Sequence, residues 1–149
     1  MDSNQIESEK KLARELFNAC WDLIEKKNRS PEEDQEMVRL AQESRRHWGV
    51  VGTAREWSIG EWQCARVNSL VGNGEAALRH AQESAKFCAD FPRPHFMHAS
   101  SCEALAFAYY VFGDTTKAQE FKTMALMELA GVPDEDAARI RDQIAELPF

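Results

Sequence analysis

The sequence predicts an all-α fold built from paired helices. Three observations lead to this prediction: sharp helix-start and helix-stop signals, apolar residues that recur with a helical period between them, and a repeat of about 40 residues. We expect seven helices and no sheet, because the only β-like string, Val50-Val51, lies between two glycines. The expected helices cover residues 4–27, 31–48, 54–71, 74–90, 95–112, 115–130 and 134–147.

Capping residues mark where several of these helices begin and end. Ser30–Glu33 combines an N-cap serine, a proline at the first helical position and a glutamate at the third, which predicts a capping box. Thr53–Glu56 predicts a second capping box. Gly72-Asn73 and Gly113-Asp114 each end one helix with a left-handed glycine and cap the next with a short polar side chain.

Apolar stripes indicate how these helices pack. Leu12, Leu16 and Cys20 begin a stripe along the first helix. The helix expected over residues 54–71 has apolar residues on two sides, which is typical of a helix sandwiched between neighbours. The following helix carries a stripe of small residues that lets helices approach closely: Ala77, Ala81, Ser84 and Cys88.

The repeat has a period that matches one pair of helices. The tetrapeptide Ala41–Ser44 recurs as Ala81–Ser84, a shift of 40 residues. A shift of 41 residues then superposes small residues and a glycine turn: Ala65 on Ala106, Gly72 on Gly113, and Ala77 on Ala118. We therefore expect one domain, residues 1–149, with stacked hairpins over 4–48, 54–90 and 95–130 and a capping helix over 134–147.

The third hairpin has a regular pattern of residue types. A leucine and an alanine, a tyrosine three residues on, a glycine turn and two later alanines run through it: Leu105, Ala106, Tyr109, Gly113-Asp114, Ala118 and Ala125. This pattern resembles the tetratricopeptide repeat family. Cys102 stands where that family has a large residue, and Lys122 stands where it has an aromatic one.

The second hairpin resembles the same family through its small residues and its glycine. The matching positions are Ala65, Gly72, Ala77, Ala81 and Ser84, while Asn68 stands where tyrosine is usual. The resemblance covers residues 58–130, and the period exceeds the family's usual length of about 34 residues. It implies a right-handed superhelix of stacked antiparallel hairpins, whose first helices line a concave groove.

The resemblance also implies which side chains face that groove: Ile59, Trp62, Arg66, Ser69, Ser100, Glu103, Phe107 and Val111. Trp62 and Arg66 are four residues apart on one helical face, and Glu103 and Phe107 each follow 41 residues later. With Ser69 they form the predicted binding surface, because tryptophan and arginine are enriched at binding hot spots. The competing interpretation is that the tryptophans belong to the core between hairpins.

Three potential metal ligands are spaced along the expected fifth helix. His95, His98 and Cys102 stand at positions i, i+3 and i+7, which places two imidazoles and a thiol on one helical face as a candidate metal half-site. The competing interpretation is that both histidines stand at a helix start while Cys102 packs inside. We expect no bound metal or cofactor, and we expect all four cysteines to be buried thiols, since no CxxC pair occurs.

Composition and charge narrow the classes of function. Of the 149 residues, 44% are hydrophobic and 29% are charged, and the net charge of −7 argues against nucleic acid or an anionic membrane surface as partner. The polar start of the chain has no apolar core of the signal-peptide type, and no apolar stretch reaches the roughly 18 residues of a membrane span. We therefore expect a cytoplasmic protein.

Motifs of catalysis do not occur in the sequence. It has no nucleophile elbow, no phosphate-binding glycine loop and no zinc-protease motif. The leading hypothesis is a non-catalytic interaction module that holds a peptide, a partner protein or a second copy of itself in its concave groove. The alternatives are a metal- or small-molecule-responsive protein that uses His95, His98 and Cys102, and a small enzyme whose site leaves no sequence signature.

Overall fold

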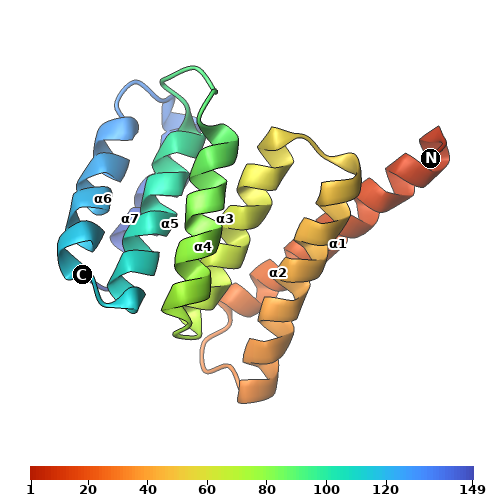
Figure 1. Cartoon of the computed structure of the whole chain (residues 1–149), viewed down its shortest axis with the longest axis horizontal. Helices are drawn as coiled ribbons and strands as arrows, with labels where there is room; N and C mark the ends of the chain where they lie inside the picture. The colour runs from red at the N-terminus through yellow and green to blue at the C-terminus, as the bar shows by residue number, and fades with distance from the viewer.

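The computed structural model describes residues 1–149 and contains seven helices and no strand (Figure 1). The helices are α1 (Ser3–Glu25), α2 (Pro31–Val51), α3 (Ala54–Leu70), α4 (Gly74–Cys88), α5 (Phe96–Phe112), α6 (Thr115–Glu128) and α7 (Asp134–Ala145). The all-α prediction is confirmed, and every expected helix is present with its ends shifted by three residues or fewer. None of the helices combines the length and the apolarity that a membrane crossing requires.

Consecutive helices form antiparallel hairpins that stack side by side. α1 pairs with α2, α3 with α4, and α5 with α6, and neighbouring hairpins touch through α2 with α3 and through α4 with α5. α7 has no partner of its own and packs on α5 and α6, behind them in the view of Figure 1. The N-terminal end of α1 projects beyond the rest of its hairpin.

Most of the predicted caps are present in the structure. Ser30 and Glu33 form the expected reciprocal capping box at the start of α2. Gly72 and Gly113 have positive φ angles of 83° and 109°, which a residue without a Cβ adopts at little cost. Asp114 accepts a hydrogen bond from the backbone N–H of Lys117 at 3.0 Å and so caps α6.

Around the second loop one predicted capping box is wrong, and one helix end differs from its predicted position. Thr53 makes no capping bond to the backbone; its hydroxyl lies 3.2 Å from a carboxylate oxygen of Glu56, so no capping box forms. The string Val50-Val51 is helical and forms the last turn of α2, which ends at Gly52. Helix α2 therefore continues past residue 48, where the sequence predicted its end.

Small buried residues hold the hairpins together. Ala65, Ala77 and Ala81 have no exposed surface and lie in the cluster between α3, α4 and α5. Ala106 and Ala118 are also fully buried, as the predicted helical register requires. All four cysteines are buried free thiols, as expected: Cys20, Cys64, Cys88 and Cys102. The largest apolar cluster joins α5, α6 and α7 and includes Ile140 and Ile144.

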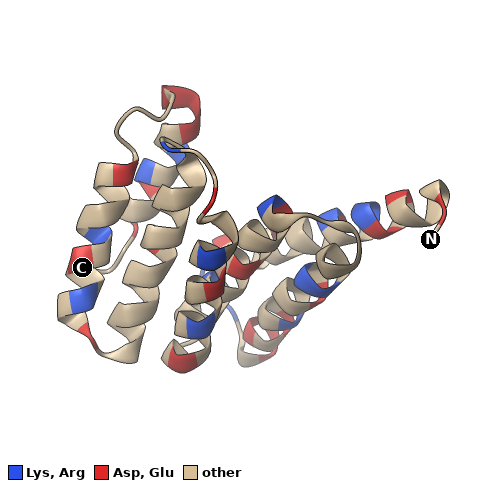
Figure 2. Ribbon diagram, turned by 45° about the horizontal axis from the view of Figure 1, so that its top comes forward, with Lys and Arg blue, Asp and Glu red and all other residues tan.

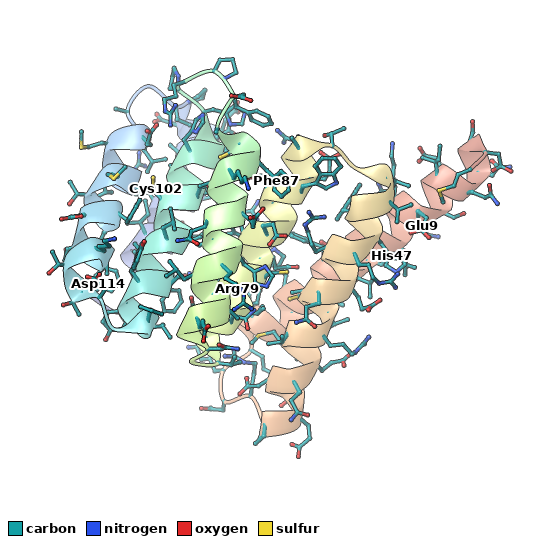
Figure 3. The ribbon with its side chains drawn as sticks, in the orientation of Figure 1. Glu9, His47, Arg79, Phe87, Cys102 and Asp114 are labelled. Atoms are coloured by element: carbon teal, nitrogen blue, oxygen red, sulfur yellow. The ribbon has the colours of Figure 1, made fainter.

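Ion pairs join the helices on the outer side of the stack. His47 of α2 lies 2.5 Å from a carboxylate oxygen of Glu9 of α1 (Figure 3). Glu61 of α3 accepts from Arg45 of α2 at 3.0 Å and contacts His80 of α4 at 2.5 Å. Burial alone raises the pKa of Glu61, but the hydrogen bonds and charges of His80 and Arg45 hold this pKa below its ordinary value.

Charge is unevenly distributed over the stack. Basic and acidic residues both lie along α2 and α4, whereas α5 is almost free of charged residues (Figure 2). The single Asp, Glu, Lys or Arg of α5 is Glu103, and its side chain is fully buried. That carboxylate contacts Trp62 and Arg66 of α3. We call this side of the stack, where the candidate site lies, the inner side.

Candidate functional site

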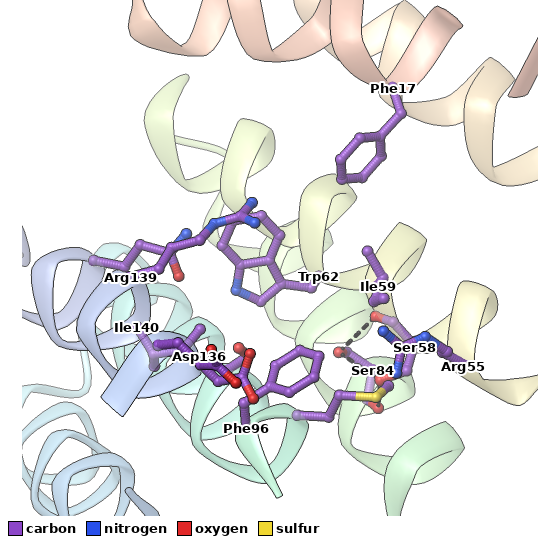
Figure 4. A pocket seen from close by; sticks show the side chains of 14 residues that line it. Phe17, Arg55, Ser58, Ile59, Trp62, Ser84, Phe96, Asp136, Arg139 and Ile140 are labelled. Atoms are coloured by element: carbon purple, nitrogen blue, oxygen red, sulfur yellow. Dashed lines mark hydrogen bonds between the residues drawn. The ribbon is translucent and has the colours of Figure 1, made fainter. Parts of the chain in front are cut away.

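A cavity of about 440 Å³ opens between α1, α3, α5 and α7 (Figure 4). This volume is within the range of pockets that hold small ligands or side chains of a partner. The wall is mostly apolar, with side chains from all four helices: Phe17, Ile59, Trp62, Phe96, Met97 and Ile140. We refer to it as the inner cavity.

Charged side chains of both signs stand at the edge of the inner cavity. Arg55 and Arg139 contribute to its lining, as do Glu135 and Asp136 of the first turn of α7. The guanidinium of Arg55 lies 5.6 Å from the centroid of the Phe96 ring, a cation–π distance that positions this aromatic wall. In Figure 4, Arg139 extends from α7 toward Trp62. The cavity thus has an apolar interior and a polar rim.

Two of the serine hydroxyls that line the inner cavity, those of Ser58 and Ser84, are hydrogen-bonded to the fold. Ser58 donates its hydroxyl to the carbonyl oxygen of Ser84 at 2.8 Å, and Ser84 donates to the carbonyl oxygen of Ser58 at 2.8 Å. This reciprocal pair joins α3 to α4 and is visible at the cavity wall in Figure 4. Because each hydroxyl has a single proton, both donors are used within the fold.

A buried polar network lies next to the cavity. The carboxylate of Glu103 accepts from the indole N–H of Trp62 and from Arg66, both at 2.9 Å. Arg66 also donates to Glu146, the C-cap residue of α7, at 3.0 Å, and its guanidinium lies 5.4 Å from the centroid of the Phe107 ring. Burial raises the pKa of Glu103, against the opposing effect of the Arg66 charge and the Trp62 hydrogen bond.

The predicted binding surface is assembled but is not an open groove. Trp62 and Arg66 lie beside Glu103 and Phe107, as the 41-residue spacing predicted. However, Trp62 is 6% exposed, Arg66 8%, Ser69 4% and Glu103 0%, so the expectation of exposed side chains is wrong. The physical reason is that α7 packs on α5 and is followed by Glu146, which bonds Arg66, while Trp21 of α1 packs on Trp62 at a ring distance of 5.6 Å.

Part of the expected groove does border the inner cavity. Ile59, Trp62 and Ser100 are among its lining residues, whereas the other expected positions are not. The accessible portion lies near the start of α7, and the remainder is covered where Arg66 meets Glu146. The candidate site is therefore shifted toward the N-terminal ends of α3 and α5.

The three potential metal ligands do not form one site. The Nδ1 atom of His95 accepts from the backbone N–H of Met97 at 3.2 Å and so caps α5. The Nε2 atom of His98 lies 2.8 Å from the carbonyl oxygen of Phe91, and Cys102 is buried. No group of three or more histidine, cysteine, aspartate or glutamate side chains is placed to hold a metal ion. Both histidines thus lie at the start of α5 and Cys102 packs inside, the placement that the competing interpretation describes.

Sequence reasoning missed the contributions of the two terminal helices. Phe17 and Trp21 of α1 and Arg139 and Gln143 of α7 line the cavities on the inner side of the stack. One signal was present, because Phe17 and Trp21 are four residues apart and lie outside the main apolar stripe of their helix. The contact of Trp21 of α1 with Arg139 of α7 has no comparable signal, since more than a hundred residues separate them.

No protein-family model, curated protein or solved structure matches the chain. The resemblance of residues 58–130 to tetratricopeptide repeats therefore rests on the residue pattern alone. A functional assignment has to be built from the geometry of the inner cavity and its surroundings.

Proposed function

We propose that this protein is a non-catalytic interaction module, similar to tetratricopeptide repeat proteins, that holds a segment of a partner protein in its inner cavity. The observation that carries the proposal is the cavity of about 440 Å³ between α1, α3, α5 and α7, with its apolar wall and charged rim. An apolar pocket surrounded by polar groups suits the anchoring side chain of a peptide. The partner is a peptide, another protein or a second copy of the chain.

The state of the nucleophilic side chains supports a role without catalysis. Burial raises the pKa of Cys20 to about 12 and that of Cys102 to about 11, which keeps both thiols protonated and unreactive at neutral pH. Ser58 and Ser84, at the cavity, are bonded to each other rather than to a general base. The net charge of −7 supports a protein partner rather than nucleic acid or a membrane surface, and the cytoplasm is the compartment we propose.

A peptide-display selection with a cavity-filling variant tests this function. Ser100 lines the inner cavity and is partly exposed, so Ser100→Phe adds a ring to the cavity without removing a core side chain. Thr123→Phe places the same ring on the exposed side of α6 and serves as the matched control. We expect peptides selected on the parent protein to bind the control equally and Ser100→Phe at least about tenfold more weakly.

Two results would contradict the proposal. One is a display selection that enriches no peptide on the folded parent protein. The other is equal binding of the enriched peptides to Ser100→Phe and Thr123→Phe. Far-ultraviolet circular dichroism and melting curves of all three proteins establish that each is folded before binding is compared.

A further inference from the structure

A second cavity adjoins the first on the inner side of the stack. Its volume is about 720 Å³, and it lies between α1, α3 and α7. Arg139 and Gln143 line both cavities, so the two share part of a wall. Four carboxylates line the second cavity: Asp22 and Glu25 of α1, Asp142 of α7, and Glu146, the C-cap residue of α7. We refer to it as the acidic cleft.

The two arginines that line the acidic cleft already have partners. Arg66 donates to Glu103 and to Glu146, so this arginine balances those two carboxylates. The guanidinium of Arg139 lies 5.8 Å from the centroid of the Trp21 ring. Asp22, Glu25 and Asp142 take part in no salt bridge, and these three acidic groups gather around one cavity. The cleft thus has an excess of negative charge that a cation would neutralise.

Unsatisfied hydrogen-bonding groups indicate what kind of cation fits. Gln143 is only 8% exposed, and the Oε1 atom of its side chain accepts no hydrogen bond. The indole N–H of Trp21, also in the cleft wall, donates none. Both atoms have almost no solvent-accessible surface, so a ligand reaches them only when the Gln143 and Trp21 side chains turn toward the cleft; an N–H donor then satisfies the first and an oxygen the second. A basic residue within a polypeptide supplies both, through its side-chain N–H groups and its backbone carbonyl.

We infer that the acidic cleft binds a lysine or arginine side chain of a partner polypeptide, while a neighbouring apolar side chain of the same segment enters the inner cavity. The inference rests on the proposed function and specifies the chemistry of the partner. The stacking of Arg139 on Trp21 illustrates the contact, since a guanidinium already lies over this ring within the protein. The shared wall of Arg139 and Gln143 brings the two subsites within reach of one short segment.

The test compares residue preferences in the display selection for two charge-matched variants. The cleft variant carries Asp22→Asn, Glu25→Gln and Asp142→Asn, all at exposed positions. The control variant carries Glu32→Gln, Glu75→Gln and Glu120→Gln, also exposed and lining neither cavity. Both triple variants change the net charge equally, from −7 to −4. A difference between them therefore reports the cleft and not the overall charge.

We expect peptides enriched on the parent protein to contain lysine or arginine near an apolar residue. The best of them should bind the cleft variant at least about tenfold more weakly and the control variant with unchanged affinity. The same peptide with norleucine in place of its basic residue should bind all three proteins equally weakly.

Three outcomes would overturn the inference. Enriched peptides without basic residues that still lose binding to Ser100→Phe would leave the proposed function in place and remove only the acidic cleft as a subsite. Basic peptides that bind the cleft variant and the control variant equally would also remove the acidic cleft as a subsite and leave the proposed function in place. Tight binding of spermine by a protein that selects no peptide would assign the cleft to a small polyamine and would contradict both proposals.

Discussion

The middle of the molecule and its two ends bring helices together in different ways. α3, α4 and α5 approach through small side chains: a Cβ added to Gly74 would lie 2.7 Å from the backbone of Phe112, and Ala77 and Ala81 are fully buried. Long side chains make the contacts at the ends: Trp21 of α1 packs on Trp62 of α3, and Arg139 of α7 lies over the Trp21 ring. Both cavities lie among these long side chains.

This difference shows where a stack of hairpins can acquire a binding site. Close contact through alanine and glycine leaves no space between helices, and so it stabilises the stack without creating a pocket. Long side chains keep helices apart and leave room of ligand size between them. The following predictions test whether the middle and the ends differ in this way, from the largest expected effect to the smallest.

The buried carboxylate of the middle should be the most sensitive position. Glu103→Ala leaves Arg66 and the Trp62 indole without their buried acceptor, and we expect a loss of about 3–5 kcal/mol in the free energy of unfolding. Glu103→Gln keeps one acceptor oxygen and the packing, so its loss should be smaller. Urea denaturation measures both. Equal losses would show that the charge of Glu103, rather than its hydrogen bonds, stabilises the fold.

Enlarging the alanines of the third hairpin should have the next largest effect on the free energy of unfolding. Ala106→Leu and Ala118→Leu insert extra carbons where no space exists, and we expect each to lower the free energy of unfolding by about 1–3 kcal/mol. Ala138→Leu, at an exposed position of α7, is the control and should change it by less than about 0.5 kcal/mol. Thermal melts of the three variants check this, and unchanged melting of the first two would mean that the helices are not in close contact.

The contribution of Glu61, in the ion pairs of the outer side, to the free energy of unfolding should depend on pH. The pKa of Glu61 is held below its ordinary value of 4.5, so its ionised form stabilises the fold above that pH, and this contribution is lost as the pH falls through the lowered pKa. Glu61→Gln should therefore be destabilising by about 1 kcal/mol at neutral pH, and the difference from the parent protein should vanish in acid. Denaturation at a series of pH values measures this, and a constant difference would contradict it.

The ion pair that attaches α7 to the middle should contribute least. Glu146 accepts from Arg66, but its side chain is 65% exposed, so water competes for the bond. We expect Glu146→Gln to change the free energy of unfolding by about 0–1 kcal/mol, far less than Glu103→Ala, although both carboxylates bind the same arginine. A loss as large as that of Glu103→Ala would mean that α7 is held mainly by charge and not by Ile140 and Ile144.

The helices and their caps could be read from the sequence because their signals are local. Gly72 and Gly113 themselves adopt the positive φ angle that ends a helix. Ser30 caps a backbone N–H only three residues away. Thr53 has the same residue pattern as Ser30, yet its hydroxyl contacts the Glu56 carboxylate instead of a backbone amide. Residue type therefore predicts where a helix starts with more success than it predicts which hydrogen bond forms there.

The candidate site was harder to predict because it depends on how α7 is placed. The spacing of Trp62, Arg66, Glu103 and Phe107 correctly predicted that these side chains meet. It could not predict their burial, since the same apolar stripe of α7 fits a helix at the end of the stack and a helix along its inner side. The acidic cleft has no sequence signature, because its carboxylates come from opposite ends of the chain.

The attachment of the first hairpin has a consequence for motion. α1 and α2 join the rest of the stack mainly through α2 and α3, so we expect this hairpin to detach as a unit while the later hairpins remain folded. Its amide protons should then exchange with solvent sooner than those of α3 and α5. Because α1 forms one wall of both cavities, detachment opens both, and any ligand that fills them will slow the exchange of α1 in proportion to its affinity.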